Sequence, residues 1–129
     1  ASGLMTPLIA AVGNHETLGS YYAGDSRKAP FFFPLFSTPG GPSYFERRLG
    51  NVQLMGLDTA HIVRHAAQKP FIERALQDDA RWRLALYHVP LYPAHRAFDG
   101  QFSAEGRAAF TVTIFPAASI NIKRGILVI

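Results

Sequence analysis

The sequence contains no cysteine, which excludes disulfide bonds and any metal site built from thiolates. This absence does not tell a reducing compartment from an oxidising one, so the localisation stays open between the periplasm, the exterior and the cytoplasm. Charged residues are also few, at 17% of the 129 residues, whereas 48% are hydrophobic. That balance is typical of one folded globular domain and not of a disordered or collagen-like chain.

Long apolar runs are missing as well, because no uncharged stretch approaches the roughly 20 residues that a membrane-spanning helix needs. The first twelve residues lack the basic start of a signal peptide. We therefore expect no membrane partner. The net charge of +4 comes from basic residues scattered along the chain, whereas nucleic-acid-binding proteins concentrate such charge on one face. The pattern argues against a nucleic-acid partner and gives weak support for an anionic substrate.

Short apolar runs alternate with one clear helical pattern, which predicts an α/β fold with a layered sheet. Residues 8–12 and 82–87 are predicted as buried strands, and residues 126–129 as the start of another. Residues 44–48 and 52–57 flank Gly50-Asn51, a dipeptide suited to a hairpin turn, so they are expected to pair antiparallel. Residues 70–80, opened by Pro70, and residues 103–110, opened by Ser103, are predicted helices.

Two of these predicted strands end at polar residues. The first runs into Gly13-Asn14-His15-Glu16, and residues 82–87 lead to His88, which Val89-Pro90 follows. An asparagine oxygen and an imidazole nitrogen form a mixed ligand set that suits zinc, iron or manganese better than calcium. A histidine beside such a metal can protonate a leaving oxygen near neutral pH. Taken alone, the first motif is also compatible with a simple turn carrying an exposed histidine, and His88 with a histidine bonded to backbone.

Three ordered motifs resemble the calcineurin-like metallophosphoesterase superfamily, which includes the purple acid phosphatases. The first is the Gly-Asn-His-Glu signature at residues 13–16. The second is the hairpin with Tyr44-Phe45, Gly50-Asn51-Val52 and Leu57-Asp58-Thr59. The third is the strand that ends in His88-Val89-Pro90-Leu91-Tyr92, similar to the family's His-x-Pro-x-Tyr pattern.

The resemblance implies an α/β/β/α sandwich with a dinuclear centre of two transition metals, Fe, Mn or Zn. It makes Asn14 and His88 metal ligands and His15 the catalytic acid. The implied activity is that of a phosphatase, a hydrolase of phosphate mono- or diesters that acts by attack of a metal-bound hydroxide. A phosphorylated small molecule, a nucleotide or a phosphoprotein would be the substrate.

The same resemblance implies that residues 1–129 are part of a single metallophosphoesterase domain, which is expected to be incomplete in this chain. The family's Asp-x-His, Gly-Asp-x-x-Asp and Gly-His-x-His elements do not occur in the sequence. With only Asn14 and His88 as ligands, the isolated chain is not expected to hold two metals.

Other candidate residues are assigned to structural roles. Glu16 either orients a neighbouring ligand or is a solvated loop carboxylate. His61, His65 and His95 are expected on the surface, and Asp58 is expected to fix the end of the hairpin through hydrogen bonds. The aromatic run at residues 31–36 is expected to pack or to cap a pocket. It also supports the alternative function, a catalytically inactive metallophosphoesterase-like scaffold that binds a protein partner.

Overall fold

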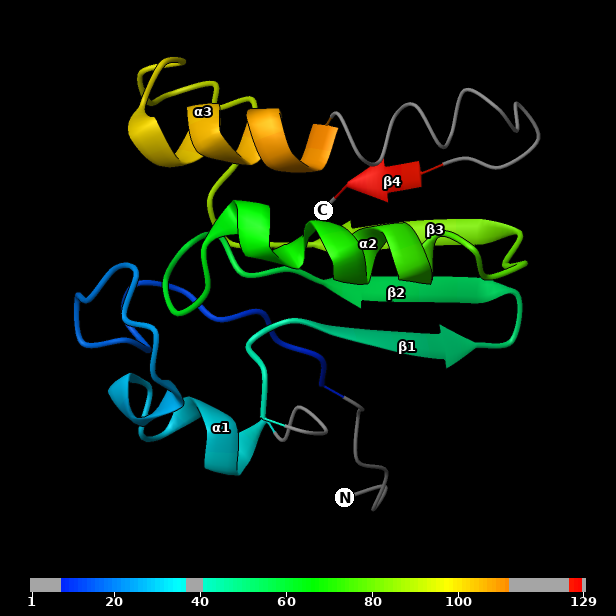
Figure 1. Ribbon diagram of the computed structural model, residues 1–129, viewed down its shortest axis with the longest axis horizontal. Coiled ribbons are helices and arrows are strands. Elements are labelled where there is room, and N and C mark those ends of the chain that lie inside the picture. The colour runs from blue at the N-terminus through cyan, green and yellow to red at the C-terminus, as the bar shows by residue number, and fades with distance from the viewer. Residues whose placement is uncertain (1–7, 37–40, 112–125, 129) are drawn as a thin grey trace, which may run out of the picture.

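The computed structural model describes residues 8–36, 41–111 and 126–128, which form a mixed α/β structure (Figure 1). One sheet has the strand order β1-β2-β3-β4. Its strands are β1 (Phe45–Leu49), β2 (Val52–Gly56), β3 (Trp82–Leu86) and β4 (Ile126–Val128). The helical elements are η1 (Ser26–Lys28), α1 (Phe32–Leu35), η2 (His65–Gln68), α2 (Lys69–Ala75), α3 (Gln101–Gly106) and η3 (Arg107–Thr111).

The predicted hairpin is confirmed. Strands β1 and β2 pair antiparallel with Leu49 opposite Val52, which leaves a loop of Gly50 and Asn51. Gly50 has a φ of 58°, whereas Asn51 keeps a negative φ. A glycine at the first central position is typical of a two-residue hairpin turn of type II′. Of the two loop residues, only Gly50 therefore supplies the positive φ of the turn.

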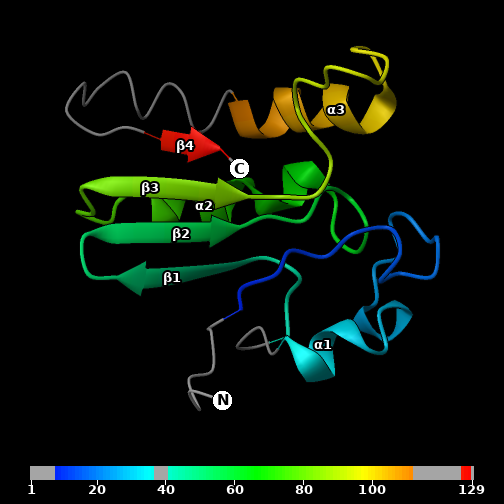
Figure 2. The same ribbon diagram turned by 180° about the vertical axis from the view of Figure 1, so that it is seen from behind.

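Strands β2, β3 and β4 run parallel to one another, and α2 provides the crossover between β2 and β3. Figure 1 shows α2 in front of the sheet, and the reverse view in Figure 2 places it behind the same strands. Phe71, Ile72 and Ala75 of α2 belong to one buried cluster with Met55 and Ala85 of the sheet. Burial of these apolar side chains holds the helix layer to the sheet.

Helix α2 begins close to the predicted position but ends at Ala75 instead of Ala80. Pro70 lies in its first turn, as predicted. At the other end, the buried Gln53 side chain donates to the Ala75 carbonyl at 2.5 Å, and the Arg83 guanidinium donates to the Leu76 carbonyl at 3.3 Å. These sheet side chains satisfy carbonyl groups that a longer helix would have bonded internally.

The first predicted strand is wrong, since residues 8–13 form no strand in the structure. Leu8 is 73% exposed and Ile9 is 36% exposed, whereas Val12 is fully buried. Instead of pairing in the sheet, Val12 packs in a second apolar cluster with Ala29, Phe32 and Ile62. The apolar run is therefore an extended segment anchored at its end. Phe32 in this cluster confirms that the aromatic run is packed, although Phe31 and Leu35 are each 72% exposed.

The second predicted helix begins at Gln101 and not at Ser103. Gly100 is the N-cap, and the Ser103 hydroxyl donates to the Pro90 carbonyl at 2.8 Å instead of capping the helix. After α3 the chain continues as the π-helical turn η3. The last predicted strand is confirmed at β4, while residue 129 lies outside the described residues. None of the helices in the described ranges is long and apolar enough to cross a membrane.

Candidate functional site

Asn14 and His88, the two predicted metal ligands, lie in direct contact although 74 residues separate them in sequence. The Asn14 Oδ1 atom is 2.9 Å from the His88 Nε2 atom. His88 follows β3 by two residues, as predicted, whereas Asn14 opens a turn at residues 14–19 and does not follow a strand. Because an amide oxygen can only accept, Nε2 carries the proton in this hydrogen bond.

Gly13 allows this contact because it has no side chain. Its backbone N–H donates to Glu16 Oε2 at 2.9 Å. A Cβ atom on Gly13 would lie 2.8 Å from Glu16 Oε2 and 2.9 Å from His88 Nδ1. Neither Gly13 nor Asn14 has a positive φ, and the left-handed positions of the turn belong to Leu18 and Gly19. The glycine is therefore required by the close approach of two side chains and not by backbone conformation.

His15, the predicted acid, is exposed in the same turn. It follows Asn14 directly in the chain, and its charge is one of the influences that lower the pKa of His88. The Thr17 hydroxyl, fully buried, closes the turn by donating to the Ser20 carbonyl at 2.7 Å. The turn thus presents His15 to solvent beside the two candidate ligands.

The pKa of His88 is lowered from its ordinary value, first by burial of part of the ring and then by the neighbouring His61. The Glu16 carboxylate acts in the opposite direction, and Arg96 and His15 add to the lowering. A lowered pKa keeps the imidazole neutral at physiological pH. Neutral imidazole is the form that binds metals.

His61 and His65 were expected on the surface, and both are buried, at 0% and 2% exposure. The physical reason lies in Asp58, whose carboxylate accepts the backbone N–H groups of residues 61, 62 and 63. These bonds fold the chain back after β2 and turn His61 inward, whereas the His65 ring packs against Phe110, with centroids 5.1 Å apart. The expected structural role of Asp58 agrees with this arrangement, which the Ser43 hydroxyl completes with a bond of 2.5 Å.

His61 is the residue of this region that sequence reasoning missed. Its ring meets the His88 ring edge to face, with centroids 5.2 Å apart, and Tyr21 covers it at 5.2 Å. Its Nε2 atom is buried without a hydrogen-bond partner. The Thr59 hydroxyl ties this segment to the His88 loop by accepting from Val89 N at 3.1 Å. The spacing of Asp58 and His61 was a signal for a side-chain-closed turn, in which residue i+3 folds inward.

The remaining predicted residues are placed as follows. Glu16 bonds to the Gly13 backbone and adjoins His88, so it is more than a freely solvated carboxylate. His95 is exposed in the loop after β3, as expected. No group of three or more histidine, cysteine, aspartate or glutamate side chains suited to a metal ion occurs among the described residues.

Comparison with known proteins gives no match: no family model, no curated protein and no solved structure is similar to this chain.

Proposed function

We propose that this chain is part of a metal-dependent phosphoesterase of the calcineurin-like type, with Asn14 and His88 as metal ligands and His15 as the proton donor. The observation that carries the proposal is the 2.9 Å contact between Asn14 Oδ1 and His88 Nε2. It joins two of the motifs that carry the family resemblance and that are far apart in sequence. The layered α/β/β/α sandwich is part of the same proposal.

The spacing of the two atoms fits a shared cation. With bonds of about 2.1 Å, two ligands at a right angle on one ion are about 3.0 Å apart. Binding would replace the present hydrogen bond, and the proton on His88 Nε2 would have to leave or move to Nδ1. The neighbouring Glu16 carboxylate favours a proton on that side of the ring. The two residues provide part of one coordination shell, and further ligands are needed to complete it.

In this proposal the protein holds the substrate's reacting end between the ligand pair and His15. Bound metals would neutralise phosphate charge and lower the pKa of water. His15, exposed beside the pair, donates its proton to the leaving oxygen. The lowered pKa of His88 keeps that ring from competing as the acid. The two histidines therefore have different roles because their surroundings differ.

The ligand assignment is tested by Asn14→Ala and His88→Ala, with His95→Ala as the matched exposed-histidine control. In the protein that contains this chain, metal content is measured together with hydrolysis of an aryl phosphate in the presence of Mn²⁺. Both substitutions should lower metal content and turnover together, and the control should change neither. Full metal content in both ligand variants would contradict the proposal.

The acid assignment is tested by His15→Ala with two substrates. An alkyl phosphate has a poor leaving group and needs the proton, whereas an aryl phosphate needs it much less. We expect alkyl phosphate hydrolysis to fall by about 100-fold, a typical contribution of a general acid, with aryl phosphate hydrolysis and metal content nearly preserved. An equal loss on both substrates would show that His15 does not act as the acid.

A second candidate is a metal-poor scaffold that binds a protein partner through the aromatic segment. Two observations favour it: the absence of a group of three or more acidic, histidine or cysteine ligands in the described part of the chain, and the 72% exposure of both Phe31 and Leu35. Metal analysis separates the candidates. The scaffold should lack stoichiometric transition metal and should not hydrolyse an aryl phosphate when Mn²⁺ is added.

A further inference from the structure

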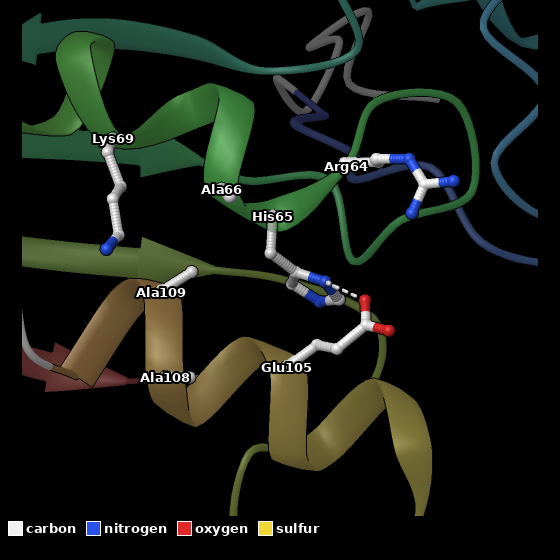
Figure 3. A pocket seen from close by; sticks show the side chains of 7 residues that line it. All are labelled: Arg64, His65, Ala66, Lys69, Glu105, Ala108 and Ala109. Atoms are coloured by element: carbon white, nitrogen blue, oxygen red, sulfur yellow. Dashed lines mark ion pairs between the residues drawn. The ribbon is translucent and has the colours of Figure 1, made fainter.

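A pocket of about 320 Å³ lies where η2 and the start of α2 face α3 and η3. Figure 3 shows the side chains of His65 and Lys69 extending from the first segment toward the helix that carries Glu105 and Ala108. The pocket shares no lining residue with the Asn14–His88 site. Its size falls at the lower end of the range for small-molecule sites, about 300 to 1000 Å³.

His65 is the buried polar group of this pocket. Its side chain is 2% exposed, and neither ring nitrogen has a hydrogen-bond partner. One face of the ring is closed by Phe110, with centroids 5.1 Å apart, and Nε2 lies 3.3 Å from the position of a Cβ atom on Gly106. Nδ1 faces the Glu105 carboxylate at 3.6 Å, which is too long for a hydrogen bond. Both nitrogens are enclosed, so the ring forms a wall of the pocket beside the carboxylate.

Glu105 is held in place from its far side. The Tyr22 hydroxyl donates to its carboxylate at 2.8 Å, and Gln101 Nε2 donates to Oε1 at 3.0 Å. The hydrogen bonds of these two residues and the neighbouring His65 outweigh desolvation and lower the pKa of Glu105, so the carboxylate is ionised. Burial lowers the pKa of His65 despite the nearby Glu105, so the imidazole is neutral. This end of the pocket therefore presents a fixed negative charge and a neutral ring.

Lys69 gives the opposite end a positive charge. Its ammonium has no carboxylate partner among the residues that the structure describes, and it lines the pocket together with the small side chains of Ala108 and Ala109. Arg64 also borders the pocket, but its guanidinium lies over the Tyr22 ring at 4.4 Å and points away from Lys69 in Figure 3. The free positive charge is thus the lysine, and the wall between the two charged ends is apolar.

We propose that this pocket binds a small zwitterion of the ω-amino-acid kind, with its carboxylate on Lys69 and its ammonium on Glu105, beside the His65 ring. The Glu105 carboxylate lies 3.6 Å from His65 Nδ1. The carbon skeleton would lie on Ala108 and Ala109. Such a ligand pairs with both the lysine and the carboxylate, which an anion or a cation alone does not. The inference stands whether or not the chain is a phosphoesterase.

The ligand class is tested with one zwitterionic probe and two probes that each lack one of its charged groups. 4-aminobutyrate carries both charges, one at each end, butyrate lacks the ammonium, and propylamine lacks the carboxylate. Binding is followed by NMR through the ring resonances of His65. We expect saturable binding of 4-aminobutyrate with a Kd on the order of 1 mM, which is reasonable for so few atoms. Each single-charge probe should bind about fivefold more weakly, as expected for loss of one half-exposed ion pair.

Two charge-removing variants assign the ends of the pocket. In Lys69→Met, 4-aminobutyrate should bind no better than propylamine, and in Glu105→Gln it should bind no better than butyrate. Lys28→Met, which removes an exposed lysine in η1, is the matched control and should leave all affinities unchanged. Ala108→Leu fills the pocket from an exposed position without changing charge, so it should abolish binding while preserving the fold.

The proposal is overturned if 4-aminobutyrate gives no saturable change, or if the three probes bind equally. It is also overturned if Lys69→Met leaves the preference for the zwitterion intact. Thermal unfolding of each variant checks that it is folded. If Glu105→Gln does not fold, Lys69→Met and Ala108→Leu still test the proposal. Lys69→Met must remove only the preference for a ligand carboxylate, whereas Ala108→Leu must remove all binding.

Discussion

Replacing Gly13 by alanine places a methyl group where two side chains already meet. The new Cβ atom would lie 2.8 Å from Glu16 Oε2, 2.9 Å from His88 Nδ1 and 3.0 Å from His88 Cε1. Such contacts are shorter than van der Waals separation, so something must move. The exposed Glu16 side chain can rotate away, whereas the His88 ring is attached to a segment that follows the sheet. We expect both to shift.

The cost follows from the bonds that these shifts break. Rotation of Glu16 gives up its bond from Gly13 N, and displacement of the ring by a few tenths of an ångström weakens the 2.9 Å bond to Asn14. Since a typical hydrogen bond contributes about 0.5 to 1.5 kcal/mol, Gly13→Ala should lower the free energy of unfolding by about 1 to 3 kcal/mol. Denaturant unfolding followed by circular dichroism measures this loss, and NMR of the His88 ring reports the displacement.

Gly19→Ala is the matched control in the same turn. Nothing lies within 4 Å of its added Cβ, but its φ of 78° is unfavourable for alanine. It should lose about 1 to 2 kcal/mol through backbone conformation while leaving the His88 resonances unchanged. The double variant Gly13→Ala/Glu16→Ala removes one of the two clashes and should recover part of the ring position. If Gly13→Ala keeps wild-type stability and unshifted His88 resonances, the steric reasoning is refuted.

Three further predictions concern the rest of the fold. Burial lowers the pKa of His65 below its ordinary value of 6.5, so the unfolded chain binds more protons below that pH, and the free energy of unfolding should fall as the pH drops through 6.5. His65→Gln should show a smaller fall, and a pH profile identical to that of the wild type would contradict this. Gln53→Leu removes bonds to Glu46, Ala75 and Arg83 and should cost about 2 to 4 kcal/mol in denaturant unfolding, so a loss below about 0.5 kcal/mol would show that the buried network contributes little. Gly56→Ala would place Cβ 2.3 Å from the Phe45 ring and should lower the free energy of unfolding by about 1 to 3 kcal/mol. Adding Phe45→Leu to Gly56→Ala should relieve the clash, so equal stability of Gly56→Ala and the double variant would argue against it.

The parts of the fold that follow from local chemistry could be predicted from sequence. The hairpin at Gly50 and the strand before His88 are set by turn residues and short apolar runs, and the structure contains both. The strand predicted at residues 8–12 does not form, because an apolar run indicates burial but not the surface that will cover it. Val12 packs in the cluster with Phe32 and not in the sheet.

The candidate site likewise has a part that could be predicted from sequence and a part that could not. Asn14, His15 and His88 were selected by their motifs and the resemblance that these carry. The structure adds the contact of Asn14 with His88, while the roles of the three residues stay predictions. The burial of His61 was not predictable from its four-residue spacing to the next histidine, because it depends on Asp58 accepting three backbone N–H groups. Such side-chain bonds depend on the tertiary structure, which the periodicity of the sequence does not indicate.

Two apolar clusters occur among the described residues, and the Asn14–His88 contact connects the parts of the chain that they anchor. Val12, just before Asn14, belongs to the cluster with Phe32, whereas Ala85 and Leu91, on either side of His88, belong to the cluster with Met55. Stability need not be uniform across such a structure, and a unit held by fewer buried side chains can open while the other stays folded. The contact would therefore break in a partial opening that leaves the sheet intact. A cation shared by these two residues would act as a latch between the clusters, slowing that opening without strengthening the sheet itself.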